Sequence, residues 1–290
     1  MWLVAVNPTS GNGKGERVAR RVAIFLHQRE INYLEVTAPD AASLLRLLQE
    51  KITEFSQDLD GVIAVGGDGL AHLVLQAVVP ARVAFAVVPA GTGNDFVRTL
   101  GWSLDQIEPL LQKVISSPPQ EVDLGLVDNE WFGAILSTGF DSVVNERANT
   151  LSWPKGPSRY NVAIALELAR FKPISYEIVC DGQPITAEAM LVAIGNGKSY
   201  GGGMNICPQA QLHDGLFDVV LLEPVSKIEF LKVFPQVYSG SHISHPKVRT
   251  LRASKVSISA NAVAYADGER IGAAPLSAEC IKGAGLTWTL

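Results

Sequence analysis

The sequence predicts an α/β N-terminal domain with a parallel sheet, followed by a β-rich domain that forms a two-layer sandwich. In the first 117 residues, short apolar segments alternate with amphipathic helical segments, which is typical of a parallel α/β layer. From residue 118 onward, short strand-like segments separated by turn residues take over. Pro118 and Pro119 mark the change, so we expect domains at 1–117 and 118–275.

The first domain begins with an apolar strand at residues 2–6, and further apolar strands are expected at 61–65 and 83–88. A shorter strand is expected at 33–37. Between these strands, apolar residues recur at helical spacing, and Asp40 can cap one of the helical segments. The helices are expected at residues 16–29, 40–55, 70–79, from 95 onward, and 105–115.

In the second domain, turns at 128–129 and 181–182 separate segments that are rich in apolar and β-branched residues. Two segments carry helical spacing instead, at 158–171 and 226–237. The strands are expected at residues 121–127, 130–136, 174–180, 186–194, 255–260, 262–266 and near the C-terminus.

Composition narrows the class of protein. The chain has 290 residues, of which 47% are apolar and 18% charged, as in a folded globular protein. No segment approaches the roughly 18 uninterrupted apolar residues of a membrane span, and no signal peptide precedes the first strand, so we expect a cytoplasmic protein. The net charge of −5 argues against nucleic acid as a partner. The three cysteines and five histidines form no disulfide or zinc pattern.

Three glycine-bearing loops follow strands of the first domain, at 7–15, 66–69 and 91–95. Because parallel strands end at the same edge of a sheet, we expect these loops to converge. Backbone amides of glycine can approach phosphate oxygens closely, so the loops favour a polyphosphate site over unrelated tight turns. The residues expected to contact the nucleotide are Asn7, Ser10, Gly11, Lys14, Gly66, Gly67, Asp68, Gly69, Gly91, Thr92, Gly93 and Asn94.

Carboxylates in these loops are candidates for holding Mg²⁺, which prefers oxygen ligands. Asp68 and Asp95 are the first candidates, and Asp123 is a third. The alternatives are a helix N-cap for Asp95 and an ordinary strand-end carboxylate for Asp123. Lys14 and Arg17 could neutralise phosphate charge, or could simply lie at a solvated helix start.

The three motifs, Asn-Pro-x-Ser-Gly, Gly-Gly-Asp-Gly and Pro-x-Gly-Thr-Gly-Asn-Asp-Phe, resemble in this order the catalytic domain of the diacylglycerol kinase and sphingosine kinase family. The similarity is greatest to the soluble bacterial members and covers nearly the whole chain. It implies a first domain like that of NAD kinases and phosphofructokinases, ATP and Mg²⁺ as cofactors, and an active site between the domains. It also implies that residues from about 276 to 290 return to the first domain. One departure is Leu70, where the family usually has Thr or Ser.

Two motifs of the second domain extend the resemblance. Residues 201–218 resemble a signature in which an Asp-Asp-Gly turn holds a structural Mg²⁺, although here His213 replaces the first Asp and only Asp214 remains. A hairpin turn without metal is the alternative. Residues 264–269 resemble the Asp-Gly-Glu motif, which implies that Asp267 is the general base on a lipid hydroxyl and that Glu269 supports it. Without the other motifs, an ordinary Asp-Gly turn would be the first interpretation.

Two sequence features could contact the lipid or the membrane surface. The segment 153–157 combines Trp153 with a lysine, as interfacial segments often do. A basic cluster could meet anionic headgroups, although solvated strand faces explain it equally well. The cluster consists of Lys247, Arg249, Arg252 and Lys255.

The resulting hypothesis is an ATP- and Mg²⁺-dependent lipid kinase that acts first on diacylglycerol, giving phosphatidic acid. Sphingoid bases or other lipid alcohols are alternative substrates, and an NAD kinase or a non-catalytic nucleotide-binding regulatory protein are alternative functions. The expected partner is a lipid at the membrane surface, reached by peripheral contact. A homodimer is a possible assembly.

Overall fold

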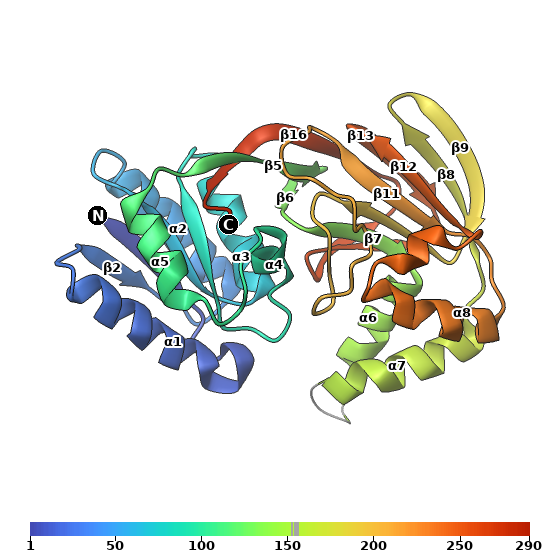
Figure 1. Cartoon of the computed structure of the whole chain (residues 1–290), viewed down its shortest axis with the longest axis horizontal. Helices are drawn as coiled ribbons and strands as arrows, with labels where there is room; N and C mark the ends of the chain where they lie inside the picture. The colour runs from blue at the N-terminus through green and yellow to red at the C-terminus, as the bar shows by residue number, and fades with distance from the viewer. Residues whose placement is uncertain (152, 154–156) are drawn as a thin grey trace.

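In the computed structural model, residues 1–151, 153 and 157–290 are described, and they form an α/β part beside a β-rich part (Figure 1). The connection between the parts runs from α5 (Ile107–Ser116) into β5 (Gln120–Val127). We propose the domain boundary in this connection, between residues 117 and 118. None of the helices in the described part of the chain is long and apolar enough to cross a membrane.

The first sheet has the order β2–β1–β3–β4, and all its pairings are parallel, as the sequence predicts. Its central strands are apolar along their whole length because helices cover both faces. The strands are β1 (Trp2–Val6), β2 (Tyr33–Val36), β3 (Gly61–Gly66) and β4 (Phe85–Pro89). The helices are α1 (Ser10–His27), α2 (Ala41–Glu54), α3 (Asp68–Val78), α4 (Asp95–Thr99) and α5.

The second half contains two sheets whose inner faces share one apolar core, which confirms the predicted sandwich. One sheet has the order β12–β11–β10–β7–β14–β15 and the other β6–β5–β16–β13–β8–β9. Their further strands are β6 (Glu130–Phe132), β7 (Ile135–Gly139), β8 (Ile174–Cys180), β9 (Gln183–Ala189), β10 (Leu191–Gly195), β11 (Phe217–Leu222), β12 (Val248–Ala253), β13 (Lys255–Ala260), β14 (Val263–Ala266), β15 (Glu269–Ala273) and β16 (Leu276–Thr287).

Helices cover the outer face of the sheet that contains β7, where Figure 1 shows them below the sandwich. They bury Phe140 and Phe230 against Leu191 and Val220 of that sheet, which forms a separate apolar core. These elements are α6 (Phe140–Thr150), α7 (Pro157–Arg170), α8 (Lys227–Val233) and the 3₁₀ helices η1 (Phe234–Val237) and η2 (Ser241–Ser244).

Two strands predicted as continuous are each divided between the two sheets. The segment 130–136 splits at residues 133–134 into β6 and β7, and the segment 186–194 splits after Ala189 into β9 and β10. The apolar pattern continues across both breaks, so periodicity does not reveal that the chain changes sheet. The helix predicted at 226–237 is also divided, because it tightens into the 3₁₀ helix η1 after Val233.

The last strand links the two halves of the chain. β16 pairs with β5 and β13 within the sandwich. Beyond it, the Trp288 and Trp2 ring centroids lie 5.9 Å apart, and the Leu290 N–H donates to the Leu100 carbonyl at 3.0 Å. Residues 276–287 therefore pair within a sandwich sheet, and the end of this strand, together with the residues after it, contacts the first domain, as in the bond from the Thr287 hydroxyl to the Phe85 carbonyl at 2.6 Å.

Candidate active site

The three glycine loops meet at the carboxyl edge of the first sheet. A Cβ atom placed on Gly91 would lie 2.5 Å from the Cα atom of Gly67. A Cβ atom on Gly11, where φ is +57°, would lie 2.3 Å from the Ala90 carbonyl oxygen. Only glycine permits such close contact between loops. The structure therefore brings the three predicted loops together.

Polar side chains shape these loops from within. Asn94 is buried, and its amide bonds to Gly91 twice: the Gly91 N–H donates to Oδ1 at 2.9 Å and Nδ2 donates to the Gly91 carbonyl at 2.8 Å. The Oδ1 atom of Asn7 accepts from the Thr9 N–H and hydroxyl at 3.2 and 2.9 Å. These atoms of both asparagines therefore hold the loops in shape. Of the same loops, Thr92 and Gly93 line the cavity.

Asp68 and Asp95 approach each other across Gly93. A Cβ atom on Gly93 would lie 2.7 Å from Oδ2 of Asp68 and 3.2 Å from Oδ2 of Asp95. The Phe96 N–H donates to Oδ1 of Asp68 at 3.1 Å. Burial and then the negative charge of Asp95 raise the pKa of Asp68 to about 6. Burial is therefore the main cause of this shift, and repulsion between the two carboxylates adds to it.

Asp95 also ties the two halves of the chain together. Its Oδ2 atom accepts from the Gly202 N–H at 2.7 Å, and its Oδ1 atom accepts from the Gly203 N–H at 2.8 Å and the Ser199 hydroxyl at 3.2 Å. The side chain is buried. The glycine-rich segment at residues 201–203, which the sequence analysis identified, therefore contacts the nucleotide loops through Asp95.

Asp267 lies at the turn between β14 and β15, with a left-handed φ of +52°. Its Oδ1 atom accepts from the N–H groups of Ala134 and Ile135 at 2.8 and 3.2 Å. Its Oδ2 atom accepts from the Gly133 N–H at 2.8 Å and lies 3.4 Å from Nδ1 of His72. The break between β6 and β7 exists because these amides bind Asp267 instead of continuing a strand.

Glu269 and Leu70 flank the Gly-Gly-Asp-Gly loop. A Cβ atom on Gly69 would lie 2.6 Å from Oε1 of Glu269, so the exposed glutamate rests against this loop. Leu70 is buried, and a Cβ atom on Gly66 would lie 2.6 Å from its Cδ2. The residue that replaces the usual hydroxyl therefore packs beneath the loop.

His72 is a site residue that the sequence analysis missed. It is buried, and its Nε2 lies 2.9 Å from Oε1 of Glu130 while its Nδ1 faces Asp267. Burial alone would lower the pKa of His72, but the bonds to Asp267 and Glu130 outweigh it and raise the pKa to about 9. A histidine on an otherwise apolar helix face indicates only a core position, so sequence carried no signal for this role.

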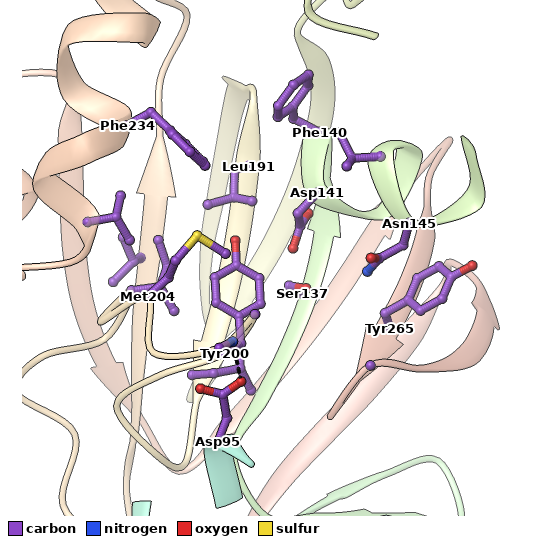
Figure 2. A pocket seen from close by; sticks show the side chains of 18 of the residues that line it. Asp95, Ser137, Phe140, Asp141, Asn145, Leu191, Tyr200, Met204, Phe234 and Tyr265 are labelled. Atoms are coloured by element: carbon purple, nitrogen blue, oxygen red, sulfur yellow. Dashed lines mark hydrogen bonds between the residues drawn. The ribbon is translucent and has the colours of Figure 1, made fainter. Parts of the chain in front are cut away.

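One cavity of about 660 Å³ joins this centre to an apolar chamber. Asp68, Asp95 and Asp267 line one end, and Asp95 is visible at the foot of Figure 2. Apolar side chains from α6, α8, η1 and the covered sheet line most of the rest. They include Phe140, Val144, Leu191, Val220, Leu222, Phe230, Val233, Phe234 and Val237.

Asp123 and Asp214 lie in a different cluster and do not line the cavity. Asp123 is buried and accepts from the N–H groups of Gly215 and Gly283 at 2.6 and 2.9 Å. Asp214 pairs with Arg252. The structure therefore groups Asp68 with Asp95, and Asp123 with Asp214. Over the described ranges, no set of three or more His, Cys, Asp or Glu side chains is arranged to hold a metal ion.

The basic cluster expected to meet lipid headgroups is paired within the protein. Lys247 and Arg249 lie 3.5 and 3.9 Å from Glu223, Arg252 pairs with Asp214, and Lys255 lies 3.6 Å from Glu279. These three acidic partners, which lie outside the cluster in sequence, offset most of its positive charge. Of the other expected lipid-contact segment, Trp153 is exposed, and residues 154–156 lie outside the described part of the chain.

A glycine-lined carboxylate centre that opens into an apolar chamber defines a kinase-like enzyme with a lipid acceptor. Residues 1–127 match the family described as diacylglycerol kinase catalytic domain, and residues 134–286 match the YegS C-terminal NAD kinase beta sandwich-like domain. The chain belongs to this family of lipid kinases, which confirms the resemblance drawn from the motifs. Membership implies the use of ATP.

Two curated relatives support the assignment, and a solved structure supports the fold. The chain is 35% identical to a diacylglycerol kinase of Mycobacterium tuberculosis, covering 94% of this chain and 89% of that one. It is 30% identical to a diacylglycerol kinase of Bacillus subtilis, covering 76% and 74%. The crystal structure of a diacylglycerol kinase from Bacillus anthracis has a TM-score of 0.72 at 19% identity, covering 100% and 96%, and shows the same fold.

Proposed function

We propose that this enzyme transfers the γ-phosphoryl group of ATP to the free hydroxyl of diacylglycerol, giving phosphatidic acid. The observation that carries the proposal is a continuous cavity with a group of carboxylates at one end and mainly apolar side chains along the rest. A lipid alcohol needs both ends, because its hydroxyl must reach the phosphate while its chains leave water. Neither the phosphorylation of NAD nor the binding of a nucleotide by a regulatory protein requires an apolar chamber.

The glycine loops supply the nucleotide end. We propose that the N–H groups around Gly11, Gly67 and Gly91 bind the phosphates, with Lys14 neutralising part of their charge. Mg²⁺ fits beside Asp68, because its carboxylate lies near that of Asp95 and no Lys or Arg is among the described residues that line the cavity. When bound, Mg²⁺ would supply further neutralisation of the phosphates.

Asp267 is the proposed acceptor of the lipid hydroxyl proton. Three backbone N–H groups hold its carboxylate in place at the cavity wall. We propose Oδ2 as the accepting atom, because its contact with His72, at 3.4 Å, is the longest of the four. His72 would orient this oxygen, and Glu269 would support the adjacent loop.

Helix α8 and η1 present an apolar surface on their outer side. Phe230 and Phe234 face the cavity, whereas Ile228 and Leu231 are 69% and 58% exposed. Tyr238, just beyond η1, lines the cavity and is also exposed. We propose that this outer surface contacts the bilayer peripherally, so that a lipid enters the cavity without crossing water.

The direct test is phosphorylation of a lipid panel. Purified protein is incubated with radiolabelled ATP, Mg²⁺ and mixed micelles that contain diacylglycerol, a sphingoid base or another lipid alcohol, and with NAD in a parallel reaction. We expect thin-layer chromatography to show label chiefly in phosphatidic acid. Label in NAD alone, or in no acceptor at all, would rule out the proposal.

A further inference from the structure

A band of polar side chains crosses the cavity between the carboxylate centre and the apolar chamber. It consists of Ser137, Asp141, Asn145 and Tyr200, all of which line the cavity. In Figure 2, Asp141 points into the cavity between Ser137 and Leu191. Buried polar groups need hydrogen-bond partners, so a polar band in an otherwise apolar chamber indicates a polar part of the ligand.

Asp141 has an unused atom in this band. Its Oδ1 accepts from the Ser142 N–H at 2.8 Å, whereas its buried Oδ2 meets no donor at good hydrogen-bond geometry in the described structure, although the Ser137 hydroxyl is close enough to lower the pKa of this carboxyl. A carboxylate oxygen left unpaired inside a cavity costs free energy, which the protein recovers if a ligand satisfies it. The free Oδ2 of Asp141 therefore indicates that a group of the ligand forms a hydrogen bond with this atom.

The surroundings of Asp141 favour its neutral form. Burial raises the pKa of Asp141 to about 6, and the hydroxyls of Ser137 and Ser142 and the adjacent N–H groups offset part of this rise. The titratable groups that face it are Tyr176 of β8 and Tyr200, and both are uncharged because burial raises the pKa of each phenol further above its usual range. Elsewhere in the cavity, burial lowers the pKa of His242, so this ring is also uncharged at neutral pH.

A lipid in the cavity strengthens this preference. Apolar chains displace water from the chamber, and loss of water further disfavours the ionised carboxyl. A neutral carboxylic acid carries an O–H that donates a hydrogen bond. Diacylglycerol brings two ester carbonyls, both acceptors, close to its reacting hydroxyl, and these carbonyls need donors once they leave water.

We propose that Asp141, as the neutral carboxylic acid, donates a hydrogen bond from Oδ2 to an ester carbonyl of the lipid, and so selects ester-linked over ether-linked lipid alcohols. The inference rests on the proposed function, and it identifies the ester carbonyl as the substrate group that this cavity recognises.

The test compares diacylglycerol with the dialkylglycerol of matched chain length, which keeps the hydroxyl and chains but lacks the carbonyls. The ratio of kcat/KM for the two lipids is measured at the same pH, from 5.5 to 8.5, so that pH effects on the phosphoryl-transfer step cancel. For wild type we expect a preference for the ester of about 10-fold at pH 5.5, the size of one hydrogen bond, that declines toward 1 as pH rises.

Two variants separate recognition from folding. Asp141→Asn keeps a donor that does not titrate, so its ester preference should persist across the whole pH range. Asp141→Leu should show no preference at any pH. Equal kcat/KM for both lipids in wild type, a preference that grows with pH, or a pH-dependent preference in Asp141→Asn would each overturn the inference. Failure to phosphorylate either lipid would instead overturn the proposed function, and the inference with it.

Discussion

Replacing Asp267 by Asn tests both the architecture and the chemistry of the site. Both oxygens of Asp267 accept hydrogen bonds from backbone N–H groups, so an amide NH₂ in either orientation faces a donor. In one orientation the N–H groups of Ala134 and Ile135 lose their acceptor, and in the other the Gly133 N–H and Nδ1 of His72 lose theirs. Each unsatisfied buried donor costs about 1–3 kcal/mol, which corresponds to a fall in Tm of about 2–6 °C for a chain of this size.

The chemical effect of Asp267→Asn should be much larger than the effect on stability. If Oδ2 accepts the proton of the lipid hydroxyl, its loss should lower kcat by about 10²–10⁴-fold. ATP affinity should change little, because the nucleotide loops belong to the first domain. Circular dichroism gives the Tm, and steady-state kinetics well below it give kcat.

Asp181→Asn is the matched control. Asp181 also precedes a glycine, has a positive φ of +46°, and accepts from the N–H groups of Ser254 and Lys255 at 3.0 and 2.8 Å. It does not line the cavity. Its substitution should lower Tm and leave kcat unchanged. The reasoning fails if folded Asp267→Asn keeps more than about a tenth of wild-type kcat, or if Asp181→Asn loses as much activity.

Three further predictions concern other parts of the molecule. At pH values below 6.5, His72→Gln should have a lower Tm than wild type. This difference in Tm should vanish as pH rises through about 9, because the folded state raises the pKa of His72 and the charged form is lost there. A difference in Tm that does not depend on pH would contradict the ion-pair role. Asp95→Ala should weaken ATP binding measured by calorimetry and also lower Tm, since it frees the tie to the second domain; unchanged values for both would refute this. Ile228→Glu with Leu231→Glu should reduce co-sedimentation with diacylglycerol-containing vesicles and spare activity on detergent micelles, whereas Ile24→Glu, at a 57% exposed site on α1, should do neither; equal losses in both variants would remove the membrane surface.

The sequence determined the architecture of the first domain because the signals there are local. Continuous apolar segments become buried parallel strands, and glycines end them, as at Gly66 and Gly67. Asp40 caps α2 as expected, accepting from the Ser43 N–H at 2.8 Å. The proximity of Asp68 and Asp95 also followed, because parallel strands deliver their loops to a single edge.

The tertiary structure alone decided which residues complete the site. His72 meets Asp267 across 195 positions of sequence, and the chain switches sheets at residues 133–134 because that same carboxylate binds the amides there. Asp123 pairs with the loop at Asp214 instead of the nucleotide loops. Asp141 stands in a polar band only because α6 lies over the apolar chamber. Local patterns encode whether a segment is buried, but the partners of a buried polar group come from distant parts of the chain, so only the folded chain identifies them.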